Sequence, residues 1–234
     1  LVELGGLELA QCGKRADHVV VAIGDRRSGV AEQDIHFVGN TMIDTLLAHM
    51  ERLRPPPFWG KAGLQPKGYL VMTLHRPANV DSPDGFAAVL GAVGEAVRGM
   101  PVVFPVHPRT AKTLAEIASA VPPNLLIVEP QPYLEFNYLV RHAKAVITDS
   151  GGVTEETTVM GVPCITMRGT TERPETVTMG TNELIGTDPA RLKPALDRLF
   201  AGEWKRGAIP PLWDGRTGAR IVAILERLVV APAG

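Results

Sequence analysis

Cysteine is scarce in this sequence, which contains two among 234 residues, Cys12 and Cys164. Two cysteines are too few for a disulfide framework, and Cys164 lies within an apolar run, so a reduced thiol in a cytoplasmic protein is expected. Long apolar runs are missing as well. No stretch approaches the roughly 20 residues that cross a bilayer. The first residues also lack the basic region and apolar core of a secretory signal.

An excess of charge of one sign is absent, because 24 Lys and Arg oppose 25 Asp and Glu. The net charge of −1 argues against a nucleic-acid-binding protein that relies on a global basic field. The six histidines are scattered without the close pairings of a zinc site, and Cys164 has no partner nearby in the sequence. We therefore expect no metal and no cofactor.

Two common catalytic motifs are also incomplete around the glycine pair Gly151-Gly152. No lysine follows these glycines, as it would in a kinase-type P-loop. The position two residues before Ser150 is not glycine, as it would be in a nucleophile elbow. Neither a P-loop nor a serine hydrolase is therefore favoured.

What the sequence does contain is a regular alternation of short β-branched runs with amphipathic helical patterns. The predicted strands are Val19–Ile23, Tyr69–Leu74, Val102–Pro105, Leu125–Val128, Ala145–Thr148, Pro163–Met167 and Glu183–Ile185. The predicted helices are Thr41–Leu53, Pro83–Arg98, Arg109–Ala120, Leu134–His142, Val153–Met160, Pro174–Met179, Pro189–Phe200 and Thr217–Val229. This alternation predicts an α/β fold with a parallel sheet covered by helices on both faces.

The expected domain organisation is a single compact domain over residues 39–234. Residues 1–38 show no regular pattern and no initiator methionine, so we interpret them as a remnant or a truncated amino-terminal segment. A connector rich in proline and glycine, from Pro55 to Pro66, separates the first part of the chain from the regular alternation. Ligands of parallel α/β folds bind at the carboxyl ends of the strands, so the loops that follow the predicted strands should line one edge.

The most informative of these loops follows the strand that ends at residue 148. Ser150, Gly151 and Gly152 stand where a helix begins, and backbone amides without neighbouring β-carbons bind phosphate at such a place. Glu156 is positioned to accept hydrogen bonds from sugar hydroxyls, and Arg173 to supply a cation. A strand followed by glycines is often only a tight connection. The added carboxylate and arginine favour a nucleotide-sugar site.

Two charged residues beside this motif are expected outside the site. Glu155 should face solvent or interact with the dipole of the helix that it begins. Arg168 should simply end its strand in solvent.

Histidines follow two other predicted strands. His75, next to Arg76, can donate to a diphosphate and carry a proton near neutral pH, against the alternative of a loop histidine bonded to a carbonyl. For His107 a ligand contact and a local structural bond are equally compatible with the sequence. Asn79 or Asp81 is expected to cap the next helix.

The loop before the helix that starts near residue 134 offers groups for a nucleobase. Gln131 has the donors and the acceptor to read a uracil edge, and Phe136 could stack on the base. Phe136 and the tyrosines beside it are equally compatible with simple packing at helical spacing.

Taken together, these motifs resemble one family. In their order and spacing they are similar to those of bacterial non-hydrolysing UDP-N-acetylglucosamine 2-epimerases, over roughly Val38 to Leu228. The matching segments are Thr73–Asn79, Val106–Pro108, Asp149–Glu156 and Thr171–Glu175.

The resemblance implies one Rossmann-like half of a two-domain GT-B-type enzyme. Members of this family interconvert UDP-GlcNAc and UDP-ManNAc by eliminating UDP across C1–C2 and adding it back, in cell-envelope polysaccharide biosynthesis. His75 would be the catalytic group that stabilises or protonates departing UDP, and Arg76 and His107 would match a regulatory UDP-GlcNAc site. The substrate-binding residues implied are Gln131 and Phe136 for uracil, Ser150, Gly151 and Gly152 for the phosphates, Glu156 for ribose and Arg173 for the sugar diphosphate.

The sequence departs from the family in two places. Ala78 stands where members usually carry a glutamate before the motif's asparagine. Residues 1–33 show no match to the amino-terminal carboxylates that would move the C2 proton. The resemblance therefore implies that the chain mainly supplies the UDP-binding half, and that by itself it binds UDP with weak or no epimerisation.

Two alternatives remain open from the sequence. One is a hydrolysing epimerase or a glycosyltransferase of the same fold, and the other is a non-catalytic UDP-sugar-binding module. In all of them the expected partners are UDP, UDP-GlcNAc and UDP-ManNAc, with neither nucleic acid nor membrane. The resemblance implies a homodimer for an intact protein.

Overall fold

The computed structural model describes residues 2–4, 7–9, 20–21 and 35–230. The chain divides into two compact units, one formed by Glu51–Ile209 and one formed by both chain ends, Leu1–Met50 and Pro210–Gly234. No helix in the described ranges has the length and apolar character to cross a membrane.

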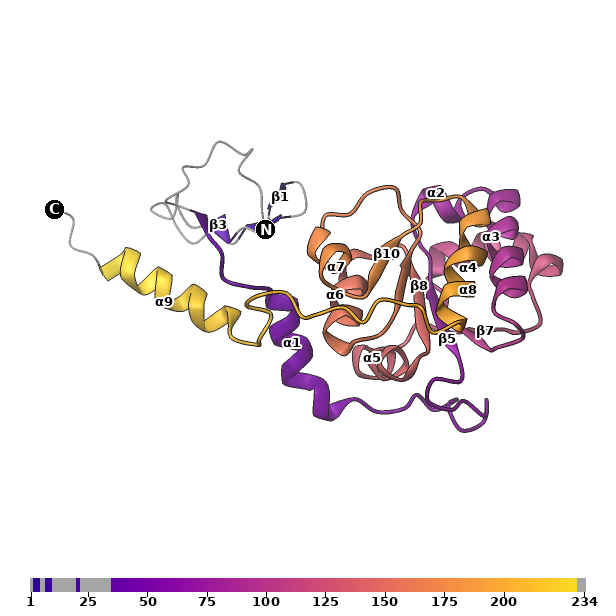
Figure 1. Cartoon of the computed structure of the whole chain (residues 1–234), viewed down its shortest axis with the longest axis horizontal. Helices are drawn as coiled ribbons and strands as arrows, with labels where there is room; N and C mark the ends of the chain where they lie inside the picture. Colours follow the sequence, from indigo (N-terminus) through magenta and orange to yellow (C-terminus); the bar gives the residue numbers. More distant parts are fainter. Residues whose placement is uncertain (1, 5–6, 10–19, 22–34, 231–234) are drawn as a thin grey trace. The chain divides into compact units, whose positions relative to one another are not determined.

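The larger unit is built on a six-stranded sheet in which every pair of neighbours is parallel. Its strands are β5 (Leu70–Thr73), β6 (Val102–Pro105), β7 (Leu125–Val128), β8 (Ala145–Thr148), β9 (Cys164–Thr166) and β10 (Asn182–Leu184). They lie in the order β10-β9-β8-β5-β6-β7, with β5 and β8 at the centre (Figure 1). This is the Rossmann order, in which the chain builds outward in both directions from the first strand. The six strands predicted between residues 69 and 185 are confirmed.

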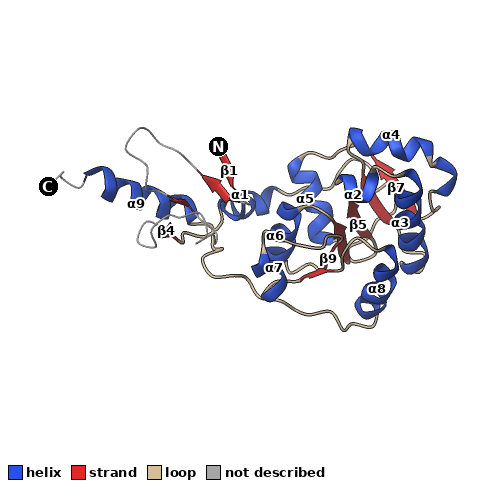
Figure 2. Cartoon of the chain, turned by 90° about the horizontal axis from the view of Figure 1, so that it is seen from above, coloured by secondary structure: helices blue, strands red, loops and turns tan. Residues whose placement is uncertain are grey.

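Helices cover both faces of this sheet, as predicted (Figure 2). The helices of the unit are α2 (Pro77–Val80), α3 (Pro83–Ala96), α4 (Pro108–Glu116), α5 (Tyr133–His142), α6 (Gly151–Met160), α7 (Pro174–Thr178) and α8 (Leu192–Phe200), with short 3₁₀ turns at Ala118–Ala120 and Pro189–Arg191. α3, α4 and α8 pack on one face, and α5 and α6 pack on the other. The short helix α2 had no counterpart among the predicted elements.

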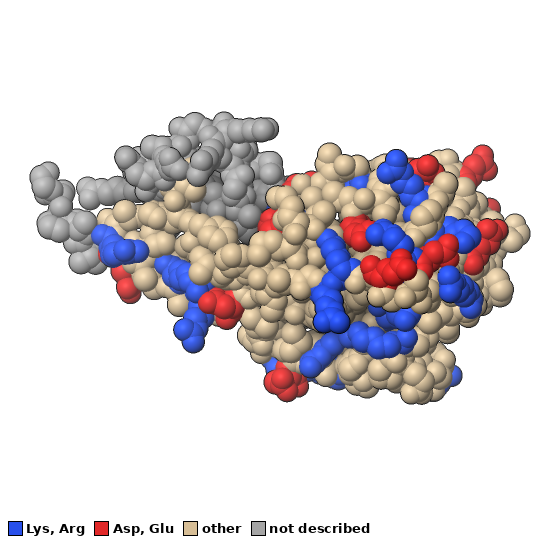
Figure 3. Space-filling view, viewed as in Figure 1, with Lys and Arg blue, Asp and Glu red and all other residues tan. Residues whose placement is uncertain are grey.

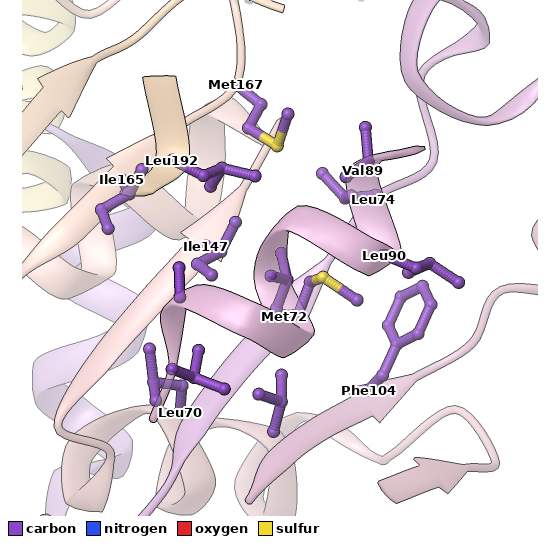
Figure 4. Close-up of a cluster of buried hydrophobic side chains, with 14 of the residues drawn as sticks. Leu70, Met72, Leu74, Val89, Leu90, Phe104, Ile147, Ile165, Met167 and Leu192 are labelled. Carbon is purple, nitrogen blue, oxygen red and sulfur yellow. The ribbon is translucent and has the colours of Figure 1, made fainter. Parts of the chain in front are cut away.

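The alternating side chains of β5 and of Tyr69, just before it, explain the two layers. Leu70 and Met72 belong to the cluster that α3 and α8 cover, which Figure 4 shows at close range. Tyr69 and Val71 point the other way and belong to the cluster that α5 covers. All four are fully buried. A strand that is apolar at successive positions must be covered on both faces, and these apolar runs are why the sequence predicted helices on both faces of the sheet.

The start of α3 corrects one expectation. Ser82, not Asn79 or Asp81, is the N-cap of α3, because its hydroxyl accepts a hydrogen bond from the amide of Gly85. Pro83 occupies the first helical position, where its missing N–H is harmless. Asn79 instead lies within α2, where its side chain is buried and engaged elsewhere.

The proline-bearing connector is packed within the larger unit. The ring of Trp59 makes edge contacts with Tyr69 and with Tyr138 of α5. Arg54 donates to the carboxylate of Glu135, also in α5, at 2.7 Å. The connector is therefore attached to the α5 face of the sheet.

In the smaller unit, helices from the two ends of the chain are joined. α1 (Thr41–His49) continues into a 3₁₀ turn at Met50–Arg52, and α9 (Thr217–Val230) is the last helix. The carboxylate of Asp44 in α1 accepts hydrogen bonds from the amides of Thr217 and Gly218 at 3.1 and 2.7 Å, which caps the start of α9. The described short strands form an antiparallel pair, β1 (Val2–Leu4) with β2 (Leu7–Leu9), and a parallel pair, β3 (Val20–Val21) with β4 (Ile35–His36). The rest of the predicted strand Val19–Ile23 lies outside the described residues.

Gly39 is expected to be indispensable to this smaller unit. Its φ is +111°, and a β-carbon there would lie 2.3 Å from the carbonyl oxygen of Leu212. We expect Gly39→Ala to lower the free energy of unfolding by about 3 kcal/mol, because backbone strain and a clash with main chain add together. Urea unfolding followed by circular dichroism measures it. Gly91→Ala is the matched control, because nothing lies within 4 Å of its β-carbon position. Equal stability of the two variants would contradict this account.

Candidate functional site

The site lies at the point where the sheet topology reverses. From β5 the chain turns to α3 on one face, whereas from the neighbouring strand β8 it turns to α6 on the other. In α/β folds such diverging connections leave a crevice at the carboxyl ends of the strands, and ligands bind there. The loop with His75 follows β5, and the loop with Ser150 follows β8. The predicted motifs therefore meet at the centre of the sheet.

Asp149 joins these loops. Its carboxylate is fully buried and accepts hydrogen bonds from the amides of His75 and Arg76, with shortest distances of 3.1 and 2.9 Å. The side-chain amide of Asn79 donates to the same carboxylate at 2.9 Å and to the carbonyl of Met167 at 3.2 Å. One carboxylate thus ties the loop after β5 to the end of β8, and Asn79 extends the connection to the end of β9.

The ionisation of Asp149 follows from these contacts. Burial alone would raise the pKa of its carboxyl. Hydrogen bonds from His75, Asn79 and the Arg76 amide outweigh burial, so the pKa lies below its usual value. Asp149 is therefore a buried anion that accepts hydrogen bonds and donates none.

The same anion fixes the proton arrangement of His75. Nδ1 of His75 lies 3.0 Å from Oδ1 of Asp149, and because the carboxylate can only accept, Nδ1 carries a proton. Nε2 is then the atom that remains for a ligand, as an acceptor in the neutral ring and as a donor in the cation. The His75 side chain is 47% exposed, so a ligand can reach it. The predicted catalytic histidine is thus held by an aspartate.

The start of α6 has the geometry expected of a phosphate site. The Ser150 amide donates to the Thr148 hydroxyl at 3.0 Å, whereas the Ser150 side chain makes no capping hydrogen bond to the first turn. A β-carbon at Gly151 would meet nothing within 4 Å, so the space beside its backbone is open. Gly152 follows in the same first turn. A 10-residue helix that starts with amides beside open space favours an anion.

Glu155 corrects one of the two alternatives given for it, because it does not face solvent. It is 1% exposed and its carboxylate pairs with the guanidinium of Arg173. Glu155 lies one helical turn after Gly151, so Arg173 is held against α6 near the helix start. Its side chain retains 20% exposure. The arginine expected at the diphosphate is therefore anchored beside the helix that carries the glycines.

Arg168 corrects a third expectation. Instead of ending a strand in solvent, it is 7% exposed and makes two parallel hydrogen bonds to the Glu172 carboxylate, at 2.8 and 2.5 Å. Hydrogen bonding from Arg168 lowers the pKa of Glu172 to about 2, and the charge of Arg76 contributes to this shift. The segment before Arg173 is thus held by the ion pair of Arg168 with Glu172, and the charge of Arg76 in the loop after β5 further favours the ionised form of Glu172.

Glu156 is linked to the loop expected to read uracil. Asn137 of α5 donates to Oε1 of Glu156 at 3.3 Å, and Tyr133 at the start of α5 also hydrogen-bonds to Glu156. Burial raises the pKa of the Glu156 carboxyl to about 7, and the nearby charge of Glu155 adds to the rise against these two hydrogen bonds. Glu156, expected at the ribose, and α5, expected beside the base, are therefore parts of one hydrogen-bonded group.

The two residues expected at uracil have different surroundings. Phe136 packs against the hydrophobic cluster on the α5 face. Gln131 donates to the carbonyl of Glu129 in its own loop at 2.7 Å. It also lines a mostly apolar hollow of about 1050 Å³, with Leu114 of α4 and Ile127 of β7. This hollow lies at the edge of the sheet rather than at the α6 glycines.

His107 and Arg76 flank the site from the β5 and β6 side. Arg76 donates through Nε to the carbonyl of Asp149 at 2.9 Å. His107 is exposed just before α4, and Thr110 in the first turns of that helix donates to the carbonyl of Leu74 at 3.1 Å. The loops after β5 and β6 are thus connected.

Sequence reasoning gave no site role to Asn137, and it did not predict the contacts of two residues that it did name, Asp149 and Tyr133. Asp149 is separated from His75 by 74 positions, so only the sheet topology could have paired them. The signal for Asn137 was a polar residue in the buried stripe of an amphipathic helix. Within the part of the chain that the structure describes, no group of three or more His, Cys, Asp or Glu could hold a metal ion.

Charges outside the site are mixed rather than segregated. Figure 3 shows acidic and basic side chains side by side on the visible face of the larger unit. Exposed ion pairs such as Arg98 with Asp197 and Arg198 with Glu183 contribute to this pattern.

Comparison with known proteins gives one family. The family model for UDP-N-acetylglucosamine 2-epimerase matches residues 25–226. The chain is 36% identical over 211 residues to the UDP-N-acetylglucosamine 2-epimerase of Methanocaldococcus jannaschii, covering 85% of this chain and 56% of that protein. It is 34% identical over 216 residues to the Escherichia coli enzyme of the same name, covering 86% of this chain and 57% of that protein. The chain thus spans about half the length of these relatives.

Solved structures agree with the sequence comparison. The M. jannaschii UDP-GlcNAc 2-epimerase in complex with UDP-GlcNAc and UDP superimposes with a TM-score of 0.71 at 35% identity, covering 85% of this chain and 56% of that one. The Neisseria meningitidis UDP-GlcNAc 2-epimerase bound to UDP-GlcNAc gives a TM-score of 0.71 at 27% identity, covering 85% and 57%. The fold is thus that of about half of a GT-B-type 2-epimerase.

Proposed function

Because the chain belongs to the UDP-N-acetylglucosamine 2-epimerase family, we propose that it forms the UDP-binding part of an enzyme that interconverts UDP-GlcNAc and UDP-ManNAc. The observation that carries the proposal is the buried Asp149 carboxylate, which holds His75 beside the open helix start at Gly151. A proton carrier and an anion site are thereby held together at the topological switch point of the sheet.

The proposed roles follow the chemistry of each group. The amides of Ser150, Gly151 and Gly152 bind the diphosphate, assisted by the charge of Arg173. Glu156 accepts hydrogen bonds from the ribose hydroxyls, and the uracil is bound by Gln131 and Phe136. These assignments are supported by the helix start, by the pairing of Arg173 with Glu155, and by the link from Glu156 to α5.

His75 is the proposed catalytic residue. In the elimination step the bond from C1 to UDP breaks and the oxygen of departing UDP gains electron density. His75 as imidazolium can donate the Nε2 proton to that oxygen, while its Nδ1 keeps its proton and its hydrogen bond to the Asp149 carboxylate. Removal of the C2 proton requires a separate base.

Arg76 and His107 are proposed to contact a second, regulatory nucleotide sugar. Their supporting observation is their position on the connected loops after β5 and β6. We further propose a cytoplasmic location, with which the buried free thiol of Cys164 is compatible, and a homodimer.

The test is calorimetry of the 234-residue chain with UDP, beside an assay for UDP-ManNAc. We expect UDP to bind and turnover by this chain alone to be weak, because positioned proton transfer contributes about 10²–10⁴-fold. Gly151→Val should fold, since nothing lies within 4 Å of its β-carbon position, but should lose most affinity for UDP. Gly91→Val, in equally open space on α3, is its control. Absence of binding at millimolar UDP would refute the proposal, whereas release of free ManNAc would indicate a hydrolysing enzyme.

A further inference from the structure

Asn137 is an unusual residue for its place in the fold. It lies on the buried side of α5, is 0% exposed, and is followed by the core residues Leu139 and Val140. Its Nδ2 donates to Glu156, but its Oδ1 is buried and has no hydrogen-bond partner among the described residues. An apolar side chain would pack there without leaving a buried oxygen unpaired. What the asparagine contributes in return is its hydrogen bond to Glu156.

Tyr133 supports Glu156 from the other end of the same helix segment. Its hydroxyl hydrogen-bonds to the Glu156 carboxyl, while the residue as a whole is 39% exposed. Asn137 and Tyr133 lie four positions apart, so they project from one face of α5 toward α6. Two donors from one helix therefore hold the same carboxylate, and Glu156 itself is 5% exposed.

The acceptor capacity of Glu156 then matches a diol. An ionised carboxylate offers about four acceptor positions. Asn137 and Tyr133 use two of them, which leaves two for hydroxyl donors that arrive from outside the protein. A ribose presents two neighbouring hydroxyls, whereas a 2′-deoxyribose presents only one.

We propose that Asn137 and Tyr133 are positioning residues that hold Glu156 for the two ribose hydroxyls and thereby set the preference for a ribonucleotide over a 2′-deoxyribonucleotide. The inference rests on the proposed UDP site. Neither residue contacts the reacting atoms of the sugar, so their replacement changes which nucleotide is held and how tightly.

The test compares UDP with 2′-deoxy-UDP by calorimetry at pH 8. Wild type is expected to bind UDP at least about tenfold more tightly, because each hydrogen bond to a charged group is worth about that factor. In Asn137→Leu and in Tyr133→Phe the affinity for UDP should fall about tenfold. The affinity for 2′-deoxy-UDP should fall less than that for UDP in both variants, because only one of its ribose hydroxyls depends on Glu156, so the ratio of the two affinities falls toward one.

Asn182→Leu is the matched control. Asn182 is also fully buried and hydrogen-bonded, to Thr166 and Thr176 at the β10 edge of the sheet. This variant should lose stability and retain the wild-type ratio, which separates a general loss of packing from a specific loss of selection. Tyr133→Phe removes a single hydroxyl from a partly exposed residue, so it tests the role of the Glu156 contacts even if Asn137→Leu does not fold.

The outcomes are distinguishable. If wild type binds neither nucleotide, the proposed function fails and this inference with it. If wild type binds both equally, or if Tyr133→Phe and a folded Asn137→Leu keep the wild-type ratio, the inference is overturned while the UDP site stands.

Discussion

Replacement of Asp149 by alanine is expected to lower the free energy of unfolding by about 3–5 kcal/mol. The Asp149 carboxylate is fully buried and accepts from two amides and from the side chains of Asn79 and His75. Without it, these donors remain buried or half-buried without their acceptor, and the cavity adds a further loss. Urea unfolding followed by circular dichroism is the measurement. A loss below about 1 kcal/mol would show that the loops after β5 and β8 hold without this anion.

Asp197→Ala is the control for this experiment. Asp197 also has two basic partners, Arg98 and Lys193, but all three side chains are exposed. Exposed ion pairs contribute little to stability, so the urea midpoint of this variant should stay close to that of wild type.

Asp149→Asn separates the structural from the chemical role. The amide keeps the size of the side chain, but it presents hydrogens where the carboxylate accepted them from His75 and Arg76. We expect His75 to lose its fixed Nδ1 proton, which ¹⁵N chemical shifts of the ring report directly. A wild-type tautomer in this variant would show that another group orients the ring.

The affinity for UDP-GlcNAc is expected to rise with pH up to about pH 7 and then to level off. Burial raises the pKa of Glu156 to about 7, so much of it is protonated below that pH and cannot accept from both ribose hydroxyls. Binding of the nucleotide favours the ionised carboxylate and therefore releases a proton, which gives up to about a tenfold change per pH unit below the pKa. The groups that face Glu156 are Glu155 on α6 and Tyr133 and Asn137 on α5.

Calorimetry between pH 5.5 and 8.5 in two buffers of different ionisation enthalpy, a range chosen to span about 1.5 units on either side of that pKa, gives both the affinity and the number of protons released. UDP-GlcNAc is preferred to UDP, because a terminal phosphate titrates near about pH 6 by itself. Glu156→Gln cannot ionise, so its weaker binding should be nearly independent of pH. A wild-type slope in this variant would assign the proton to another group.

The same pKa has the opposite effect on the stability of the free protein. The pKa of Glu156 is about 7 in the fold against an ordinary value of 4.5, so its contribution is fully present below about pH 4.5 and is lost as pH rises through 7. Glu156→Gln should therefore be more stable than wild type at pH 8, by on the order of 2 kcal/mol. Stability and nucleotide binding would then respond to this substitution in opposite directions.

The arrangement of loops was predictable from the sequence because it depends on local pattern. Apolar strands such as Ala145–Thr148 and the helices between them imply a parallel sheet, and a parallel sheet brings its loops to one edge. The start of a helix at Gly151-Gly152 was likewise predictable, because these glycines closely follow an apolar strand. The confirmed part of the prediction is therefore the strands and helices, which depend mainly on residues close together in the sequence.

The partners of the charged residues were not predictable in this way. From Val153 to Thr158 every residue of α6 is buried, so the helix has no polar face along this stretch by which Glu155 and Glu156 could be told apart. The contacts of Glu155 and Glu156 depend on Arg173, just before α7, and on Asn137 of α5, both of which are distant in the sequence. Arg168 was misplaced for a different reason: its partner Glu172 lies only four positions further on, in a loop whose conformation the sequence pattern does not predict. Sequence indicates which loops converge, and packing decides which charges pair.

The capping of α9 by Asp44 has a consequence for how the gene can be divided. Since α1 precedes the sheet and α9 follows it, the segment Glu51–Ile209 is inserted in sequence between the two halves of a discontinuous unit. Removal of α1 or of α9 leaves the other helix without the hydrogen bonds that join the two. A domain inserted by fusion is therefore better placed in an exposed loop of Glu51–Ile209 than beside α1 or α9.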